Sequence, residues 1–201
     1  MAFPDTQFLR AVAILLVVNS HLDHYYPISH MATGGAIGNS LFFFLSAFGV
    51  YISQRNKRRS FKEFIGDRIS RIYPSMWTVL VFISMPLMIF FGKLGSDTIM
   101  TFVGSFFDPP FWFLQALLLY YLLGHHLTVV ENATKQRLLI FLYFGGFTLL
   151  YFLLYLSWVD LSVWSVEKTP FDRIHYFIVF LFGIFVGTRN EYESRSRRTG
   201  Q

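Results

Sequence analysis

The sequence predicts an all-α fold, a polytopic bundle of about six transmembrane helices, and three observations support this prediction. Of the 201 residues, 54% are hydrophobic and only 14% are charged, whereas a soluble domain is nearer 25% charged. The mean hydropathy is +0.46, and several apolar runs reach about 20 residues, the length that crosses a bilayer as a helix. These runs are continuous rather than alternating, which argues against a transmembrane β-barrel.

The predicted spans are apolar runs that helix-breaking residues separate from one another. Pro27 closes the first run, Gly34 opens the second, and Pro74 precedes the third. Asp108 and two prolines precede the fourth run, and such clusters mark helix boundaries. The fifth run is interrupted only by a pair of glycines, and the sixth is the shortest. The spans cover roughly residues 8–27, 34–54, 72–92, 111–130, 138–158 and 173–189.

The chain is predicted to form one membrane-embedded domain over residues 1–190, followed by a polar cytoplasmic tail over residues 191–201. The first residues lack the basic region of a signal peptide, so we expect the first run to remain as a membrane anchor. There is no cysteine, which excludes a disulfide framework, a cysteine-ligated zinc site and thiol chemistry.

The positive charges are distributed unevenly among the loops. Fourteen of the 17 lysines and arginines lie on one predicted side of the membrane, whereas Lys93, Lys168 and Arg173 lie on the other. Because cytoplasmic loops carry the excess of Lys and Arg, both termini are predicted to lie in the cytoplasm. Topology and anionic headgroups then explain the net charge of +5, so no nucleic-acid partner is expected.

The first span carries an arginine and a histidine separated by an apolar run. His21 follows Arg10 by eleven residues, which in a continuous helix places both on nearly one face, about 16 Å apart along the axis. His24 lies near the same face. Arg10 could simply extend to the surface and His21 sit at the boundary. Alternatively, they form a polar track in which His21 accepts a proton, because imidazole titrates near neutral pH.

A second candidate site lies where the basic loop meets the third span. Arg68 and Arg71 are three residues apart and therefore share a helix face. Guanidinium groups suit phosphates, so the pair could hold a phosphorylated cytosolic ligand. By position alone, two more charges on the cytoplasmic side are the simpler interpretation.

Other polar and small residues are interpreted as structural. Gly38, Ser46 and Ala47 permit close helix contact in the second span, and the phenylalanines around them are expected to pack. Trp112 suits the membrane interface. His125 and His126 are adjacent and point to different faces, which makes them a poor metal pair.

The order and spacing of these motifs together resemble the acyltransferase-3 family of integral membrane acyltransferases. The matching runs are FLRAVAILLVVNSH, LFFFLSAF, DRISRIYPSMW and FWFLQALLLYY. Ala47 stands where the family usually has glycine. Members usually have more helices and a longer chain, so we interpret this sequence as a shortened member or a fragment.

The resemblance implies a membrane-embedded acyltransferase-like domain, in an integral protein of the bacterial inner (plasma) membrane. Such enzymes move an acyl group, often acetyl, from cytosolic acyl-CoA to a hydroxyl of a cell-surface or exported glycan. Carried over to matching positions, His21 and Arg10 are the catalytic pair, and Arg68 and Arg71 bind the acyl-CoA donor, with acetyl-CoA as the expected donor. No metal is expected, and the expected partners are the lipid bilayer, acyl-CoA and a carbohydrate acceptor.

Two other classes of function remain open from the sequence. A transporter or flippase module would use the Arg10–His21 track for an anion or protons. A non-catalytic membrane subunit would bind a partner protein instead. The acyl group, the acceptor, the exact role of His21 and the oligomeric state are not predicted.

Overall fold

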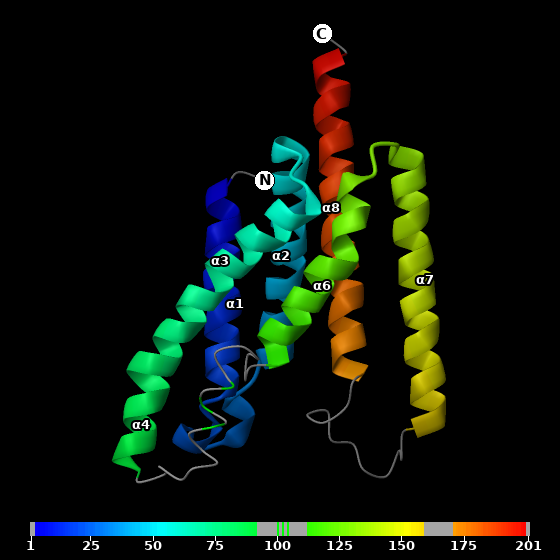
Figure 1. The fold of residues 1–201 in the computed structure, drawn as a ribbon. Helices are drawn as coiled ribbons and strands as arrows, with labels where there is room; N and C mark the ends of the chain where they lie inside the picture. Colours follow the sequence, from blue (N-terminus) through cyan, green and yellow to red (C-terminus); the bar gives the residue numbers. More distant parts are fainter. Residues whose placement is uncertain are drawn as a thin grey trace. The chain divides into compact units, whose positions relative to one another are not determined.

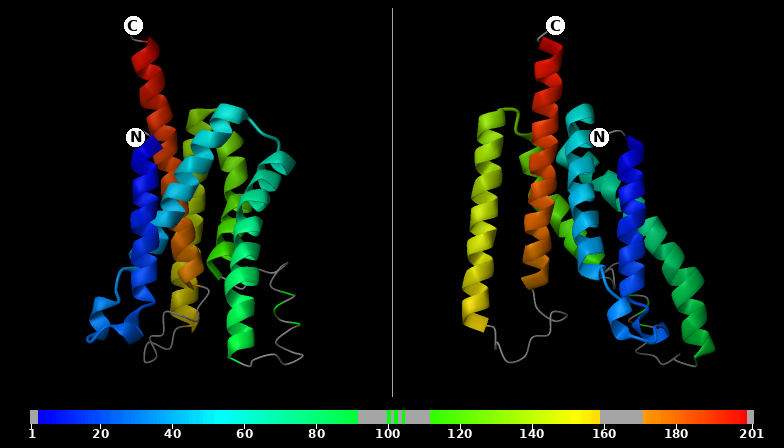
Figure 2. Two further views of the ribbon diagram at one scale, coloured as in Figure 1. Left: turned by 90° about the vertical axis from the view of Figure 1, so that its left-hand side faces the viewer. Right: turned by 180° about the vertical axis from the view of Figure 1, so that it is seen from behind.

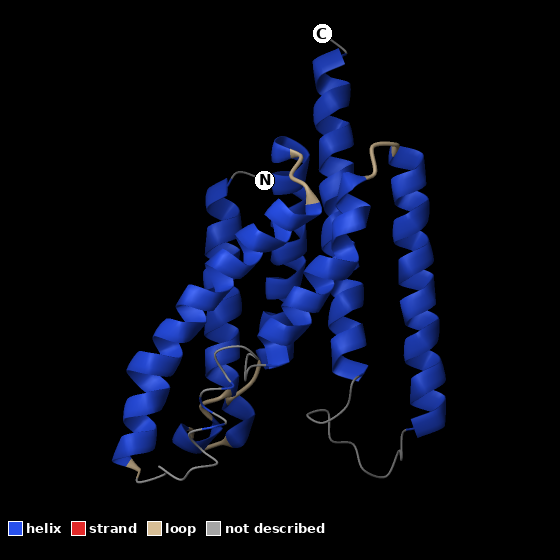
Figure 3. Cartoon of the chain, in the orientation of Figure 1, coloured by secondary structure: helices blue, strands red, loops and turns tan. Residues whose placement is uncertain are grey.

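The computed structural model describes residues 3–91, 100, 102, 104, 112–158 and 171–199. These residues are predominantly helical, and none of them forms a strand (Figure 3), which confirms the predicted all-α class. Figure 1 shows the helices in chain order: α1 (Phe3–Ser20), η1 (Asp23–Tyr25), η2 (Ser29–Met31), α2 (Gly35–Lys57), α3 (Phe61–Val79), η3 (Leu80–Ser84), α4 (Met85–Phe90), α6 (Trp112–Val129), α7 (Ala133–Trp158) and α8 (Phe171–Thr199).

Three described helical segments are long and apolar enough to cross a membrane: Gly35–Lys57, Phe61–Phe90 and Ala133–Leu153. Thr6–Ser20 and Ile174–Arg189 are shorter apolar helices. With α6, which covers the fourth predicted span, each of the six predicted spans corresponds to a described helix. The breaker predicted before the fourth span, residues 108–110, lies outside the described residues.

Two of the predicted boundaries are wrong, and each has a local cause. The first helix ends at Ser20 rather than Pro27, because the N–H of His21 bonds to Val18 O at 3.0 Å and closes a tighter final turn. The third helix begins at Phe61, because Ser60 and Glu63 form a capping box. The last apolar segment, Ile174–Arg189, matches the predicted sixth span, although the helix that contains it runs on to Thr199. The division into domain and tail stays a prediction.

The chain divides into two compact units. Unit 1 consists of Met1–Arg58 and Gly124–Gln201, and unit 2 of Arg59–Leu123. Unit 1 thus contains α1, α2, α7, α8 and the last residues of α6, whereas unit 2 contains α3, η3, α4 and most of α6.

The core of unit 1 is built around α2, which packs against α1 and α8, while α8 also packs against α7. Small residues allow the close approaches. A Cβ on Gly38 would lie 2.6 Å from the carbonyl oxygen of Ala13 in α1, and a Cβ on Gly183 in α8 would overlap the carbonyl oxygen of Phe44. The same Cβ would lie 2.8 Å from the Cβ of Ala47. The side chain of Ala47 therefore packs directly against the backbone of Gly183 in α8. The predicted small-residue packing of Gly38 and Ala47 is confirmed.

Aromatic side chains fill the remaining space between these helices. Phe43 is fully buried, and its ring lies 5.2 Å from that of Tyr176, centroid to centroid. Phe147 and Phe177 join α7 to α8 with centroids 4.5 Å apart. Phe43 of α2 therefore packs in the core, as predicted.

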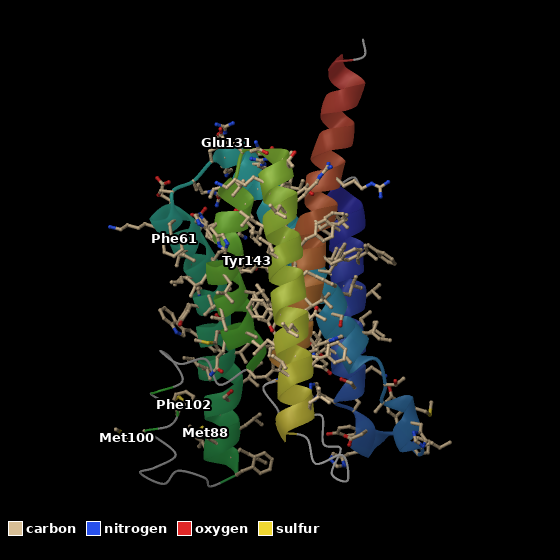
Figure 4. The ribbon with its side chains drawn as sticks, turned by 90° about the vertical axis from the view of Figure 1, so that its right-hand side faces the viewer. Phe61, Met88, Met100, Phe102, Glu131 and Tyr143 are labelled. Atoms are coloured by element: carbon tan, nitrogen blue, oxygen red, sulfur yellow. The ribbon has the colours of Figure 1, made fainter. Side chains whose placement is uncertain are left out.

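One end of unit 1 is rich in arginine. The start of α1, the end of α2, the start of α7 and the end of α8 all lie at this end (Figures 1 and 2). Arg55 and Arg58 belong to it, and Arg58 pairs at 2.9 Å with Glu131, which Figure 4 labels. The side chain of Gln136 in α7 donates to Leu127 O at 2.6 Å, which satisfies a carbonyl in the last turn of α6.

The outward faces of the long helices are apolar. Figure 4 shows Phe61 and Met88 near opposite ends of the continuous helix formed by α3, η3 and α4. On α7, the exposed aliphatic and aromatic residues include Leu138, Phe141, Leu142, Leu149, Phe152, Leu153 and Leu156. Such faces suit lipid as the solvent, because soluble proteins rarely expose large contiguous apolar patches.

Candidate functional site

Arg10 lies in the first half of α1, and its guanidinium reaches α2. A Cβ placed on Gly49 would lie 3.0 Å from Nη2 of Arg10, so the guanidinium occupies the space that the missing side chain leaves free. The Arg10 side chain remains exposed to one side. Arg10 is therefore held against α2, yet one side of it is open to a ligand.

His21 lies just beyond the other end of α1. The helix ends at Ser20, and the backbone N–H of His21 bonds to Val18 O at 3.0 Å. The prediction that Arg10 and His21 share one helix face assumed that the helix continues to His21. Because α1 ends at Ser20, the prediction does not apply to His21. Among the described residues, the imidazole of His21 makes no hydrogen bond, and it is exposed. Its position is therefore set by the backbone.

The loop after His21 is tied to α1 by Asn19. Its side-chain amide nitrogen donates to Met31 O at 2.9 Å and to Thr33 O at 3.0 Å. Its amide oxygen accepts from the hydroxyl of Tyr26 at 2.6 Å. Our sequence prediction did not include Asn19. A polar amide two residues before His21, at the end of an apolar run, was the available signal, because asparagine side chains often bond to nearby loop backbone.

His24 does not continue the α1 face. It lies in η1, its backbone N–H bonds to Asp23 Oδ1 at 2.9 Å, and its imidazole lies 3.8 Å from the same carboxylate oxygen. The side chain is 91% exposed. His24 thus has an acidic neighbour, whereas His21 has none within hydrogen-bonding distance in the described structure.

Arg68 lies in α3 of unit 2, between two aromatic rings. Its guanidinium carbon is 5.2 Å from the centroid of Phe64 and 5.4 Å from that of Tyr121. The two rings meet edge to face at 6.2 Å, and both are buried. Phe64 is one turn before Arg68 on α3, whereas Tyr121 comes from α6. The rings therefore fix the guanidinium by cation–π contacts from two helices.

The hydrogen-bonding groups of Arg68 are not all used. Its Nε and Nη2 are buried and have no hydrogen-bond partner among the described residues. The adjacent carboxylate of Asp67 accepts a hydrogen bond from Arg59, and within the described structure no hydrogen bond or ion pair joins it to Arg68. Buried donors without acceptors are costly, so this arrangement is suited to an anionic oxygen from a ligand.

Arg71 lies one turn after Arg68 on the same helix, as predicted. Its side chain is exposed, and no hydrogen bond or ion pair joins its guanidinium to a described residue. The two arginines therefore differ: Arg68 is clamped between two rings and partly buried, whereas Arg71 is exposed. Arg10 and His21 belong to unit 1 and this pair to unit 2, so each pair is described by itself.

The remaining histidines form no metal site within the described chain, where no group of three His, Asp or Glu side chains could hold an ion. His125 is buried, and the ring of His126 lies 5.0 Å from that of Tyr143. The two adjacent histidines thus have different surroundings.

These features define an integral membrane protein of apolar helices, with an arginine in the first half of α1, a histidine just beyond the end of α1, and a clamped arginine in α3. The chain belongs to the acyltransferase-3 family: the family model, described as an acyltransferase domain, matches residues 4–200. This match confirms the resemblance seen in the motifs, and the protein is a membrane acyltransferase in general function. No curated protein and no solved structure matches the chain.

Proposed function

We propose that the protein transfers an acyl group, often acetyl, from cytosolic acyl-CoA to a hydroxyl group of a cell-surface or exported glycan. The observation that carries the proposal is the clamped guanidinium of Arg68, whose buried Nε and Nη2 lack a partner among the described residues. Membership of the acyltransferase family makes the phosphates of coenzyme A the acceptors that best fit these donors.

The donor half of the proposal assigns different roles to the two arginines. Arg68 offers preorganised N–H groups to a phosphate, because Phe64 and Tyr121 limit its rotation. Arg71 is exposed and supplies a second charge that attracts the donor and contacts another phosphate. Hydrogen bonds to charged groups are worth about 1.5–3 kcal/mol each, so Arg68 contributes more to affinity than a solvated surface charge does.

The acceptor half assigns the proton transfer to His21. A sugar hydroxyl is a weak nucleophile at neutral pH, and a nearby base relieves this. The hydroxyl oxygen attacks the thioester carbonyl carbon, a C–O bond forms, and the C–S bond breaks. The proton of the hydroxyl passes to the imidazole of His21 and then to the sulfur of the departing coenzyme A. The products are the glycan ester and free coenzyme A.

Arg10 supports the same chemistry from within the membrane helix. An arginine in such an apolar helix is costly and usually faces a partner or cavity. With Nη2 beside Gly49 and one side open, Arg10 can hold an anionic or carbonyl oxygen of the donor. We place it on the donor-facing half of α1, with His21 at the acceptor-facing end.

The proposed orientation puts both termini in the cytoplasm of a bacterial cell, with the helices in the inner membrane. It is supported by the arginine-rich end of unit 1, where the start of α1 and the end of α8 both lie (Figure 1). His21 follows the opposite end of α1. The acceptor would therefore approach His21 from the outer side, and acyl-CoA would approach from the cytoplasm.

The test is acyl transfer by the purified full chain in lipid vesicles, with radiolabelled acetyl-CoA and a mixture of bacterial glycans. Label that becomes esterified to glycan, with release of free coenzyme A, would support the proposal. Movement of glycan across the vesicle membrane without ester formation would contradict it and indicate a transport function instead.

A further inference from the structure

The loop of residues 22–33, which we call the α1–α2 loop, is fastened to α1 at one side chain. Its internal backbone bonds, such as Tyr25 N to Leu22 O at 2.9 Å and Met31 N to Ile28 O at 3.0 Å, fold η1 and η2. They do not reach α1. Beyond the two residues that close the helix, the hydrogen bonds that join described groups of the loop to α1 all go to the side chain of Asn19.

Both the amide nitrogen and the amide oxygen of the Asn19 side chain bond to the loop. Both of its N–H groups bind backbone carbonyls, those of Met31 and Thr33, on the returning part of the loop. Its oxygen binds the hydroxyl of Tyr26 in the middle of the loop. One residue thus joins three points of the loop to the last turn of α1, two positions before His21.

From this we infer that Asn19 is a positioning residue that fixes His21 for proton transfer by holding the α1–α2 loop against the end of α1. The inference rests on the proposed function of His21. Catalytic imidazoles are commonly oriented by a partner on the other ring nitrogen, and in the described structure His21 has none. Its placement therefore depends on its backbone, which lies between the α1 end and the loop that Asn19 holds.

The loop also offers a surface to the acceptor. Tyr25 is 84% exposed, and it is separated from the Asn19 partner Tyr26 by one peptide bond. Fixing Tyr26 therefore limits where the exposed ring of Tyr25 can stand. Loss of the Asn19 bonds would free both the base and the surface beside it, while the α1 helix itself would keep its backbone bonds.

The test compares Asn19→Ala with Tyr26→Phe and with Asn132→Ala in the full-length protein. Asn132 is a matched control, because its side chain also caps a helix end, accepting from Lys135 N at 3.0 Å at the start of α7. Loop order is measured as the rate of chymotrypsin cleavage between Tyr25 and Tyr26. Turnover is measured with acetyl-CoA and a glycan acceptor, so that kcat and the KM for each substrate are separated.

Asn19→Ala is expected to raise the cleavage rate several-fold and to lower kcat by about tenfold or more, because a small misplacement of a catalytic group is costly. The KM for acetyl-CoA stays unchanged, whereas the KM for the acceptor changes. A general loss of folded protein would also raise cleavage and lower the apparent kcat, but it would leave both KM values unchanged. Tyr26→Phe removes one of three bonds and has a smaller effect. Asn132→Ala changes neither readout.

A second comparison uses the His21→Gln background. If Asn19 acts through His21, then Asn19→Ala lowers the residual rate of His21→Gln no further. Unchanged cleavage in Asn19→Ala, or raised cleavage with full activity while His21→Gln is inactive, would overturn the positioning role alone. Full activity of His21→Gln would overturn the catalytic assignment of His21 and the positioning role with it.

Discussion

The guanidinium of Arg10 lies against the backbone of Gly49, so that a Cβ at position 49 would stand 3.0 Å from Nη2. Among the described residues, Arg10 makes no hydrogen bond or ion pair, so this contact is what links its guanidinium to α2. A Cβ at position 49 would fit only if the guanidinium shifted by a few tenths of an ångström. The space available to the Arg10 side chain is therefore determined by a glycine on the neighbouring helix.

Gly49→Ala is expected to push the Arg10 guanidinium out of this position and to lower acyl transfer by about tenfold. The fold should survive, because the clashing atom is the end of a flexible side chain. Gly146→Ala in α7 is the control, since a Cβ there meets nothing within 4 Å, and both changes bring the same gain in helix propensity. Equal turnover of the two variants would show that the position of Arg10 does not matter.

The helices could be predicted from the sequence because hydrophobic run length is a strong signal for membrane spans. The early end of α1 could not be predicted in the same way. It depends on the Val18–His21 backbone bond, and the loop that follows is held by Asn19 through bonds to residues 12 and 14 positions later. Apolar periodicity contains no information on such long-range contacts.

The candidate site could also be predicted only in part from the sequence. The spacing of Arg68 and Arg71 gives a shared helix face, but it does not distinguish the two residues. Their difference comes from Tyr121, which lies 53 positions after Arg68 and contacts its guanidinium from α6. The contact of Gly49 with Arg10 could not be predicted either, because glycines occur in membrane helices for many different packing reasons.

Arg68→Ala is expected to weaken acyl-CoA binding by about tenfold to a hundredfold, the range for a lost charged hydrogen bond. Arg68→Lys should recover only part of the affinity, because an ammonium lacks the planar fork. Arg71→Ala should have a smaller effect. Binding is measured by calorimetry on the purified protein.

Lys62→Ala is the control for this series, because Lys62 is an exposed cation in the first turn of the same helix. It removes the same charge and should change the affinity by less than about twofold. Unchanged binding in Arg68→Ala, in protein that inserts normally, would return Arg68 and Arg71 to a purely topological role.

Gly183→Ala should destabilise unit 1 by about 1–3 kcal/mol or more, since the added Cβ meets a backbone carbonyl that cannot turn away. The clash with Phe44 would separate α8 from α2. Thermal unfolding in detergent should therefore occur at a lower temperature than in Gly145→Ala, where the space around the Cβ is open. An unchanged transition would mean that α2 and α8 are not packed as described.

The proposed orientation predicts that reporter fusions at Ser60 and at Gln201 both report a cytoplasmic location, because the positive charges concentrate on that side. Ser60 lies between α2 and α3, at the capping box. A periplasmic signal at Ser60 would reverse the sidedness of every loop, and with it the proposed access of acyl-CoA to Arg68.

His21 is the residue whose replacement discriminates best between catalysis and structure. His21→Ala should lower acyl transfer by about 100-fold or more, the usual scale for a lost general base. His21→Gln keeps a similar size and can still donate a hydrogen bond, but it cannot accept a proton at neutral pH, so it should be nearly as inactive. Initial rates of glycan esterification at saturating acetyl-CoA give the comparison.

His24→Ala is the matched control for this replacement, because both histidines are exposed and lie within one turn of each other in the sequence. His24 faces Asp23 at 3.8 Å, and its loss should reduce turnover far less than the loss of His21. If His24→Ala lowered turnover more than His21→Ala, the general base would be His24 in η1. Near wild-type turnover of His21→Gln would make His21 a structural residue, since no proton could then pass through position 21.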